Sequence, residues 1–527
     1  MAADPINSTP AIHTDAFTRM SAAPASFDVA LNDETATHAL AASVAAVLLP
    51  GDLVTLSGDL GAGKTTFARA LIRHLAGDQT IEVPSPTFTL MQNYELPRFS
   101  LVHADLYRLN GPSELSELGV DEVAENAVVL LEWPDRAGNV LSPDRFDIAL
   151  TLSPAQGSSY RSARLTGHGA FAARAGRIAT MQRFVTASPY AGAVRTQLTG
   201  DASTRAYERL TQGGRSVLMM NAPRRPDGPP VRDNKPYSAI AHLAEDVTPF
   251  IAMALALRQR GFSAPKILAA DRAAGLLLLE DFGNDFIAGG NPAAPIEERY
   301  AAAADLLAAL HRQTVPETLP VEAEVNYTLP HYDMDALLIE AELLLDWYLP
   351  RLGVAVTPAM RQTYVGLWRE ALMPATRGPQ TWVLRDYHSP NLMWLPSRTG
   401  VARVGLLDFQ DAVMGSPAYD VASLLQDARV DVPEAMEVAL LSRYVRTRLK
   451  EPGFDARGFA QLYATLAAQR ASKILGIFAR LDKRDGKPQY LRHLPRVGTY
   501  LQRALAHPAL APLKTWYAAN VPPTRTQ

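Results

Sequence analysis

The sequence predicts two domains of unlike fold, an α/β domain with a parallel sheet followed by an α+β domain with two lobes. The chain has 527 residues, more than one hydrophobic core usually serves. A glycine-rich loop, GDLGAGKT at 58–65, follows a short apolar strand and opens a helix, as in a P-loop. Downstream, Asp386, Asn391 and Asp408 have the spacing of the catalytic loop and metal aspartate of a kinase-like fold. Because these two kinds of site bind ATP differently, we expect them in separate domains.

Composition narrows the class of protein. Hydrophobic residues make up 47% and charged residues 20%, which is ordinary for a globular protein, and the net charge of -3 does not indicate general nucleic-acid binding. The absence of cysteine excludes disulfides and thiolate metal sites. Residues 1–26 are polar and rich in proline and alanine, without the apolar core of a secretory signal, and 36–49 is too short to span a bilayer. We therefore expect a disordered N-terminal tail on a cytoplasmic protein.

The region 27–165 is predicted to be an α/β P-loop NTPase domain. Apolar runs of strand length alternate with helical sequence, which favours a parallel sheet with crossover helices. The expected strands are 53–57, 101–104 and 128–131, and the expected helices are 64–75 and a segment around 113–118.

The second domain is predicted to span 181–527, after a linker at 166–180 that is rich in alanine, glycine and arginine. Its composition and patterning favour an α+β, protein-kinase-like fold with a small sheet and a largely helical remainder. The expected strands are 217–220 and 276–279, and long helical segments are expected at 300–311 and 335–347.

The loop at 58–65 has the chemistry of nucleotide binding. Its glycines let successive backbone N–H groups turn toward a phosphate, and the following helix adds its positive end. Lys64 is expected to reach the β- and γ-phosphates, and the Thr65 hydroxyl is expected to bind Mg²⁺. An accidental glycine-rich turn is the alternative, but strand, loop and helix occur in the order that the motif requires.

Two carboxylates end apolar strands in the same domain, Asp105 after 101–104 and Glu132 after 128–131. Because the carboxyl ends of parallel strands face the P-loop, these side chains are expected near Mg²⁺ and the attacking water. Taken alone, each carboxylate fits a strand-capping residue at the surface as well as it fits a site residue.

Four motifs occur in order within 27–165, namely GDLGAGKTT, PSPTFTL, HADLYRL and LEWP. Together they closely resemble the small ATPase of bacterial tRNA threonylcarbamoyladenosine biosynthesis. The resemblance implies an ATPase that joins a larger tRNA-modification complex and meets tRNA only through partner proteins. It implies catalysis by Asp105, Mg²⁺ binding by Thr65 and Glu132, and a switch loop with Ser85 and Thr87. The implied nucleotide-binding residues are Gly58, Gly61, Gly63, Lys64, Thr65, Thr66 and Trp133.

The second set of catalytic residues lies in LRDYHSPNL at 384–392 and VGLLDFQD at 404–411. In kinase-like folds the first aspartate accepts the proton of the attacking hydroxyl, while the asparagine and the later aspartate bind Mg²⁺. Asp386 is therefore predicted to be the base, and Asn391 and Asp408 the metal ligands. A structural turn beside Pro390 would explain the first motif, but it would not explain why Asp408 follows at the expected distance. The DFG triplet at 281–283 lies upstream of the base, so it fits the hinge between the lobes rather than the metal site.

These motifs, with GSPAYDVA at 415–422, resemble the aminoglycoside phosphotransferase family over 181–527. The sequences DYHSPNLMW and DFQDA are more similar to one branch of this family. That branch contains the cell-wall-recycling kinases that phosphorylate the anomeric hydroxyl of N-acetylmuramate and N-acetylglucosamine. The resemblance implies ATP and Mg²⁺ as cofactors, an amino-sugar substrate and a sugar 1-phosphate product.

Three features of the second domain each have two interpretations or a weak signal. A kinase lysine is expected after 217–220, where NAPRR stands instead, so either Arg224 or Arg225 neutralises the phosphates or both are solvated. The glycine-poor segment 199–205 is a candidate phosphate-covering loop. His388 either positions the catalytic loop or is a structural histidine.

The sequence thus predicts a bifunctional fusion of a tRNA-modification ATPase and an amino-sugar anomeric kinase, without a membrane-bound part. One alternative keeps the kinase fold but changes the substrate to an aminoglycoside, choline or another small alcohol. Another alternative makes the first domain a nucleotide-gated assembly module without catalytic turnover.

Overall fold

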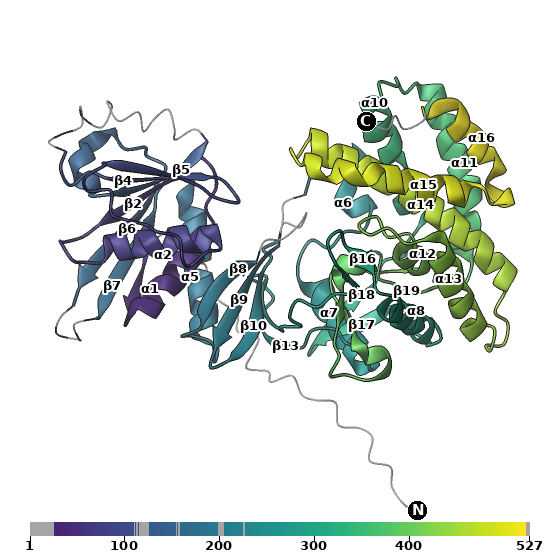
Figure 1. Ribbon diagram of the computed structural model, residues 1–527, viewed down its shortest axis with the longest axis horizontal. Coiled ribbons are helices and arrows are strands. Elements are labelled where there is room, and N and C mark those ends of the chain that lie inside the picture. Colours follow the sequence, from purple (N-terminus) through teal and green to yellow (C-terminus); the bar gives the residue numbers. More distant parts are fainter. Residues whose placement is uncertain are drawn as a thin grey trace, which may run out of the picture. The chain divides into compact units, whose positions relative to one another are not determined.

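The computed structural model describes residues 26–109, 111, 114, 126–153, 155, 157, 159–198, 205–224 and 227–522 (Figure 1). The chain divides into two units, one comprising residues 1–223 and 267–281 and the other residues 224–266 and 282–527. The predicted tail lies outside the described residues except for Ser26, the first residue of β1. The predicted helix around 113–118 and the candidate loop at 199–205 also lie outside them, apart from Glu114 and Arg205.

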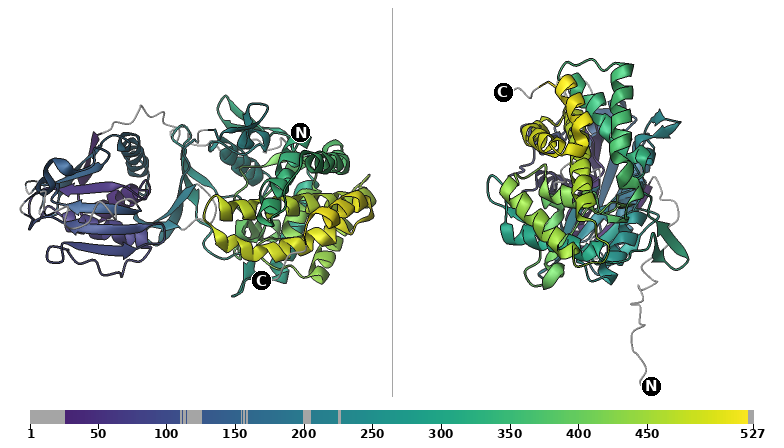
Figure 2. Two further views of the ribbon diagram at one scale, coloured as in Figure 1. Left: turned by 90° about the horizontal axis from the view of Figure 1, so that it is seen from above. Right: turned by 90° about the vertical axis from the view of Figure 1, so that its right-hand side faces the viewer.

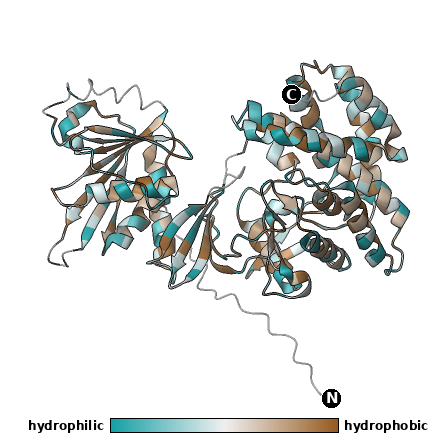
Figure 3. Ribbon diagram, in the orientation of Figure 1, coloured by the Kyte–Doolittle hydropathy of each residue, from teal (hydrophilic) through white to brown (hydrophobic). Residues whose placement is uncertain are grey.

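The first unit contains a seven-stranded sheet of order β1-β7-β6-β2-β5-β4-β3. The three predicted strands are confirmed as β2, β5 and β4; they pair in parallel with one another, and β6 joins β2 in parallel. The residues of β5 are all buried, and the middle of this sheet is apolar (Figure 3). The strands are β1 (Ser26–Leu31), β2 (Leu53–Ser57), β3 (Met91–Glu95), β4 (Ser100–Asp105), β5 (Ala127–Glu132), β6 (Phe146–Leu152) and β7 (Arg161–Gly167).

This sheet is mixed, whereas the sequence favoured a parallel one. Strands β1, β7 and β3 pair antiparallel with their neighbours. Along β1 and β7 the more buried and the more exposed residues tend to alternate, so these strands lack the continuous apolar run of the central strands. In this sheet, only β2, β4 and β5, which are buried on both faces, were predicted from the sequence.

In the described part of the first unit, three α-helices accompany this sheet, namely α1 (Glu34–Ala45), α2 (Lys64–Ala76) and α5 (Phe171–Thr186). Helix α2 begins where the helix at 64–75 was predicted. Helix α5 corrects the prediction of a linker at 166–180, because that segment holds the end of β7 and most of this helix. Phe171, Ala175 and Ile178 recur at helical spacing and are buried, an apolar face that the alanine and arginine content concealed.

A second, five-stranded antiparallel sheet belongs to the same unit, with the order β13-β14-β10-β9-β8. The predicted strands at 217–220 and 276–279 are confirmed as β10 and β14, which pair with each other. The strands are β8 (Val194–Leu198), β9 (Ala206–Gln212), β10 (Arg215–Asn221), β13 (Ile267–Asp271) and β14 (Leu276–Glu280). The chain leaves the unit between Asp281 and Phe282, at the DFG triplet assigned to the hinge.

The two sheets of the first unit share one hydrophobic core with the helices between them. The apolar cluster around α1, α2 and α5 continues into Leu210, Val217 and Leu278 of the second sheet. At this junction Arg195 of β8 donates to Ala39 O at 3.0 Å and pairs with Glu208 through two hydrogen bonds, of 2.7 and 2.9 Å. Both members of the ion pair are buried, so the junction contains a desolvated charge pair within an apolar contact.

The second unit is mostly helical (Figures 1 and 2). The predicted helices at 300–311 and 335–347 correspond to α8 and α9, the latter continuing into a π-helical turn at Leu344–Tyr348. The longer helices are α7 (Thr248–Gln259), α8 (Glu297–His311), α9 (Met334–Leu343), α11 (Pro358–Arg377), α12 (Ala418–Leu425), α13 (Glu434–Arg448), α14 (Ala456–Lys483), α15 (Leu494–Leu505) and α16 (Ala511–Asn520).

Short strand pairs hold the two predicted catalytic segments of this unit next to each other. Strand β19 pairs with β22, and β20 pairs with β21, so the chain between β19 and β20 lies beside the chain between β21 and β22. These strands are β19 (Thr381–Val383), β20 (Leu392–Trp394), β21 (Val404–Leu406) and β22 (Val413–Gly415). Shorter elements are β11 (Pro230–Arg232), β12 (Lys235–Pro236), β15 (Ala288–Gly289), β16 (Ala294–Pro295), β17 (Thr318–Glu322), β18 (Val325–Thr328), α6 (Tyr237–Ile240) and α10 (Leu349–Arg351). No helix in the described part of the chain is long and apolar enough to cross a bilayer.

Candidate active sites

The P-loop connects the end of β2 to the start of α2, as predicted. Gly58, Gly61 and Gly63 all have positive φ, at 131°, 80° and 103°. A β-carbon at Gly58 would lie 2.1 Å from the carbonyl oxygen of Leu150 on β6, so glycine is required there for steric reasons as well. The loop therefore approaches the sheet closely before it turns into the helix.

Lys64, the first residue of α2, is folded back over this loop. Its Nζ donates to Gly58 O at 2.7 Å and to Asp59 O at 3.0 Å, and it lies 3.6 Å from the centroid of the Trp133 ring. Burial lowers the pKa of the Lys64 ammonium, which is 5% exposed. The predicted lysine and tryptophan are thus brought together beside the loop, where the ammonium group is in reach of a phosphate bound by the loop.

The side chains of Thr65 and Glu132 meet next to the loop. Thr65 Oγ1 donates to Glu132 Oε2 at 3.1 Å, and Glu132 Oε1 lies 3.0 Å from Nε2 of buried His103. Thr66 is half-buried in the same first turn of α2. A hydroxyl and a carboxylate are oxygen ligands of the kind that Mg²⁺ prefers when phosphate and water complete its coordination. The residues present therefore fit the predicted metal.

Asp105 is opposite Glu132 in the register of β4 and β5, so both carboxylates stand at the same edge of the sheet. Thr87 Oγ1 donates to Asp105 Oδ2 at 2.7 Å, and the backbone N–H of Tyr107 donates to Oδ1 at 2.9 Å. Ser85 lies 2.7 Å from Thr87 and 3.4 Å from Asp105. The predicted switch loop is thus hydrogen-bonded to the predicted catalytic carboxylate, which is buried rather than a surface strand cap.

The kinase-type catalytic loop begins after β19 and is supported by buried carboxylates. Arg385 has a left-handed conformation, with φ at 66°, which turns the backbone ahead of Asp386. Asp420 on α12 accepts the backbone N–H groups of Leu384 at 2.7 Å and Arg385 at 3.0 Å. Burial raises the pKa of Asp420 to about 7, so this carboxyl serves as a hydrogen-bond anchor rather than as a fixed charge.

Asp386 lies among positive charges. Although burial opposes its ionisation, the fields of Lys473 and its neighbours lower the pKa of Asp386 below its ordinary value. Lys473 itself donates to Glu340 at 2.7 Å, and the Arg385 guanidinium also bonds to Glu340. Asp386 is therefore a carboxylate at neutral pH, the form in which it can accept a proton.

Asn391 and Asp408 are brought together with Asp386 by the hairpin of β20 and β21. The backbone N–H of Leu407 donates to Asn391 O at 2.9 Å, and Asn391 Nδ2 donates to the backbone oxygen of Asp386 at 3.0 Å. Asp408 has a left-handed φ of 56°, and its Oδ1 accepts from Gln410 Nε2 at 3.0 Å. One amide oxygen and one carboxylate fit a Mg²⁺ ion whose other ligands are phosphate and water. Within the described ranges, no group of three or more His, Asp or Glu side chains forms a metal site.

His388 and Asp427 complete the support of the catalytic loop. The backbone N–H of Ser389 donates to Asp427 Oδ2 at 2.7 Å, and His388 Nε2 lies 3.4 Å from Asn391 Nδ2. Burial lowers the pKa of His388, so its imidazole is neutral at pH 7. These contacts agree with the positioning role among the two roles left open for this histidine. Asp427 and Lys473 were missed, because neither lies in a motif that carries a catalytic role.

The region where a kinase lysine was expected shows other contacts. Asn221, the last residue of β10, accepts from Arg177 of α5 at 3.1 Å. Arg224 has a side chain that is 72% exposed and pairs with Glu245 at 3.2 Å. Arg225 lies outside the described residues. Arg224 is thus solvated and paired, which favours the second of the two readings for it.

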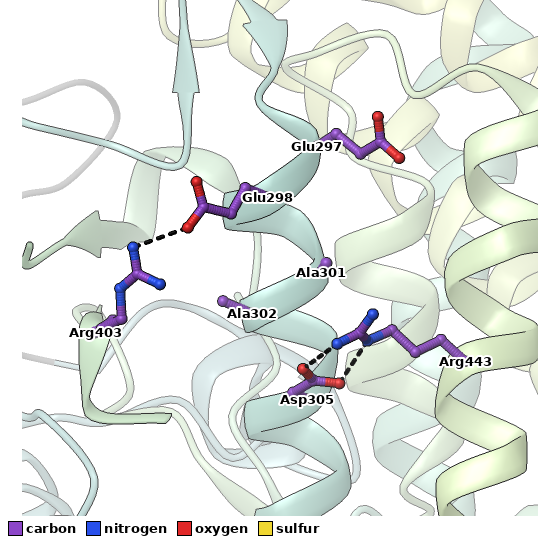
Figure 4. Close-up of a pocket in the computed structure, with 7 residues that line it drawn as sticks. All are labelled: Glu297, Glu298, Ala301, Ala302, Asp305, Arg403 and Arg443. Atoms are coloured by element: carbon purple, nitrogen blue, oxygen red, sulfur yellow. Dashed lines mark hydrogen bonds and ion pairs between the residues drawn. The ribbon is translucent and has the colours of Figure 1, made fainter. Parts of the chain in front are cut away.

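One pocket of the second unit contains none of these residues. It has a volume of about 510 Å³ and lies against α8, α13 and the short helix Gly400–Arg403 (Figure 4). Four of the charged side chains that line it form ion pairs, since Arg403 pairs with Glu298 at 2.9 Å and Arg443 with Asp305 at 2.7 Å. It contains none of the predicted site residues and is a surface crevice bridged by ion pairs.

Comparison with known proteins identifies both halves. The family described as threonylcarbamoyl adenosine biosynthesis protein TsaE matches residues 31–161, and the phosphotransferase enzyme family matches residues 194–459. A Rickettsia felis protein named tRNA threonylcarbamoyladenosine biosynthesis protein TsaE is 43% identical over 122 residues, 23% of this chain and 71% of the relative.

Two similar relatives of the second half are named N-acetylmuramate/N-acetylglucosamine kinase. The Caulobacter vibrioides protein is 41% identical over 359 residues, 66% of this chain and 97% of the relative. The Pseudomonas aeruginosa protein is 36% identical over 324 residues, 59% of this chain and 84% of the relative. The chain therefore belongs to two families in succession, the TsaE family through its P-loop domain and, through its second half, the N-acetylmuramate/N-acetylglucosamine kinase branch of the phosphotransferase enzyme family.

Proposed function

We propose that the chain is a bifunctional enzyme. Its second half transfers the γ-phosphoryl group of ATP to the anomeric hydroxyl of N-acetylmuramate or N-acetylglucosamine. Its first domain hydrolyses ATP in support of the threonylcarbamoyladenosine modification of tRNA, within a complex of partner proteins. The observation that carries the kinase proposal is the convergence of Asp386, Asn391 and Asp408 in a chain 41% identical to a kinase of that name.

In the kinase reaction, Asp386 accepts the proton of the anomeric hydroxyl as its oxygen attacks the γ-phosphorus. The bond between the γ-phosphorus and the β,γ-bridging oxygen breaks, and ADP leaves with the negative charge. Asn391 and Asp408 would hold Mg²⁺, which would neutralise negative charge on the phosphates. The lowered pKa of Asp386 keeps the base ionised, and Asp420 and Asp427 fix the loop that presents it.

A substrate panel tests the kinase proposal. The purified chain is incubated with ATP, Mg²⁺ and N-acetylmuramate, N-acetylglucosamine, an aminoglycoside or choline, and the products are read by phosphorus NMR. We expect sugar 1-phosphate from the two amino sugars, and we expect Asp386→Asn to lower kcat by about 10²- to 10⁴-fold. Unchanged turnover in this variant, or preferred phosphorylation of the antibiotic, would contradict the assignment.

In the first domain, we propose that Lys64 and the P-loop glycines hold the phosphates, that Thr65 and Glu132 hold Mg²⁺, and that Asp105 assists the attack of water. The hydrogen bonds of Thr87 and Ser85 to Asp105 support a loop that responds to the γ-phosphate. Trp133, with its ring beside Lys64, is suited to contact the nucleotide.

The cellular role of this domain is tested by replacing the chromosomal copy with Lys64→Ala and measuring threonylcarbamoyladenosine in total tRNA by mass spectrometry. We expect the modified nucleoside to fall, together with ATP hydrolysis in vitro. Asp386→Asn in the same strain is the matched control and should leave the nucleoside unchanged. Normal modification in the Lys64→Ala strain, with hydrolysis lost, would refute the role of ATP hydrolysis and favour an assembly module.

A further inference from the structure

A buried carboxylate, Glu340 of α9, lies at the centre of a polar network next to the catalytic loop. It accepts hydrogen bonds from Lys473 Nζ of α14 at 2.7 Å, from the Arg385 guanidinium and from the Tyr332 hydroxyl. Gln469 of α14 also approaches it, at 3.4 Å. Because Glu340 is fully buried, one shielded carboxylate joins two helices to the segment that carries the base.

Glu340 is ionised although no water reaches it. Burial raises the pKa of a carboxyl group, but the charges of Lys473 and Arg385 outweigh this effect and lower the pKa of Glu340 to about 2. Hydrogen bonds between ionised partners are shorter and stronger than those between neutral groups. The two cations are therefore held firmly by the same carboxylate.

Arg385 needs such support, because its backbone is left-handed. Its φ of 66° is unfavourable for any residue that has a β-carbon. The backbone N–H of Arg385 donates to Asp420 at 3.0 Å, and its backbone oxygen accepts from Ser423 Oγ at 3.2 Å. Its guanidinium donates to Ala241 O at 2.8 Å and to Glu340. The residue is thus held in this conformation through its backbone and through its side chain.

The conformation of Arg385 sets the direction in which the chain enters Asp386, the next residue. A rotation of the Arg385 backbone would move the base relative to the hydroxyl whose proton it accepts. Since a displacement of about 1 Å can lower the rate of an enzyme by about 10²-fold, the anchor of Arg385 matters to catalysis.

We propose that Glu340 is a positioning residue of the kinase reaction, which holds Arg385 in its left-handed conformation and so fixes the direction of the Asp386 carboxylate. The inference rests on the proposed kinase function and adds a residue that lies outside the catalytic motifs. Glu340 acts through Arg385 rather than on the substrate. Its loss should therefore lower kcat and leave KM almost unchanged.

The first test measures kcat and KM of the full-length chain with ATP and N-acetylmuramate. We expect Glu340→Gln to lower kcat by about 10²-fold and to change KM for ATP and for the sugar by less than about twofold. Glu342→Gln is the matched control. Glu342 lies on the same helix, is 4% exposed and pairs with Arg232 at 2.6 Å and Arg361 at 2.8 Å, neither of which belongs to the catalytic loop. Both variants should lower the melting temperature, but Glu342→Gln should leave kcat unchanged.

A glycine variant separates positioning from a loss of stability. Glycine adopts a left-handed conformation without a steric penalty, so Arg385→Gly removes the need for the anchor. We expect Arg385→Gly to keep at least about tenfold more activity than Arg385→Ala. Adding Glu340→Gln to Arg385→Gly should lower kcat by less than about threefold further, because Glu340 then has no left-handed side chain to hold.

The outcomes separate the positioning role from the function itself. A normal kcat in Glu340→Gln, or an equal loss in Glu342→Gln, would overturn the inference. So would a further loss of about 10²-fold in the double variant, or equal activity of Arg385→Gly and Arg385→Ala. A raised KM for the sugar at unchanged kcat would assign the network to substrate binding instead. If the wild-type chain phosphorylates none of the sugars, the proposed kinase function fails, and the inference fails with it.

Discussion

The two catalytic regions place their carboxylates by different physical means. In the P-loop domain, Asp105 and Glu132 are paired in register at the ends of β4 and β5, so the hydrogen bonds of the sheet fix their spacing. In the kinase half, Asp386 and Asp408 lie on loops. Asp408 has a positive φ, and so does Arg385, the residue before Asp386. Those loops are held by buried groups from other elements, chiefly Asp420 and Asp427.

The difference shows what each site depends on. A site at a sheet edge keeps the spacing of its carboxylates as long as the strands pair, and neighbouring side chains such as Thr87 and His103 then orient them. A loop site depends on a few buried polar contacts, and losing one of them disturbs the base directly. The two chemistries are separate, yet the P-loop domain shares a core with the five-stranded sheet that follows it.

The largest expected effect concerns that shared core. Arg195→Leu leaves Glu208 buried and unpaired, and we expect it to destabilise the first unit by about 3–5 kcal/mol. Thermal unfolding followed by circular dichroism measures the loss, and both activities should become heat-sensitive together. Arg164→Leu is the control, since it breaks an exposed pair with Asp28 and should cost less than about 1 kcal/mol. Equal melting temperatures for the two variants would show that the junction is not buried in solution.

The next effect separates the two proposed metal sites. Asp408→Asn removes the carboxylate predicted to hold Mg²⁺ in the kinase half, and we expect sugar phosphorylation to fall by about 10²-fold or more. ATP hydrolysis by the P-loop domain should remain, and Thr65→Val should give the converse pattern. Loss of both activities in either variant would indicate that one metal site serves the whole chain.

A smaller effect is expected behind the sheet-edge site. His103→Asn removes the imidazole that lies 3.0 Å from Glu132, and we expect the apparent Mg²⁺ affinity of ATP hydrolysis to drop about 10- to 100-fold. Raising the Mg²⁺ concentration should restore the rate, which a defect in folding would not allow. Full activity at low Mg²⁺ would contradict the positioning role of His103.

The smallest effect is a displacement of the pH profile. Because nearby cations lower the pKa of Asp386, the base is ionised throughout the neutral range, and kinase activity should not fall until the medium becomes clearly acidic. Lys473→Met removes the strongest of these cations, so the pKa of Asp386 should rise and the acid limb should move to higher pH. An unmoved limb would mean that another group controls it.

The sequence predicted which residues come together in the two candidate sites better than it predicted the residues that support them. The P-loop could be predicted because its motif follows a strand, and Asp105 and Glu132 could be predicted because each ends a strand. In the second half, the characteristic spacing predicted Asp386, Asn391 and Asp408. The role of Lys473 could not be predicted from the sequence. Lys473 lies inside the long helix α14, far along the chain from Asp386, whose pKa it lowers. Helix α5 was missed because alanine and arginine hid a narrow apolar face.

The central claim, that two independent phosphoryl-transfer sites operate in one chain, is tested most directly by a crossed measurement. ATP hydrolysis without sugar and sugar 1-phosphate formation are measured for the full-length chain, for Lys64→Ala and for Asp386→Asn. We predict that Lys64→Ala loses only sugar-independent hydrolysis and that Asp386→Asn loses only sugar 1-phosphate formation. If either substitution abolished both reactions in a folded protein, the claim would be wrong.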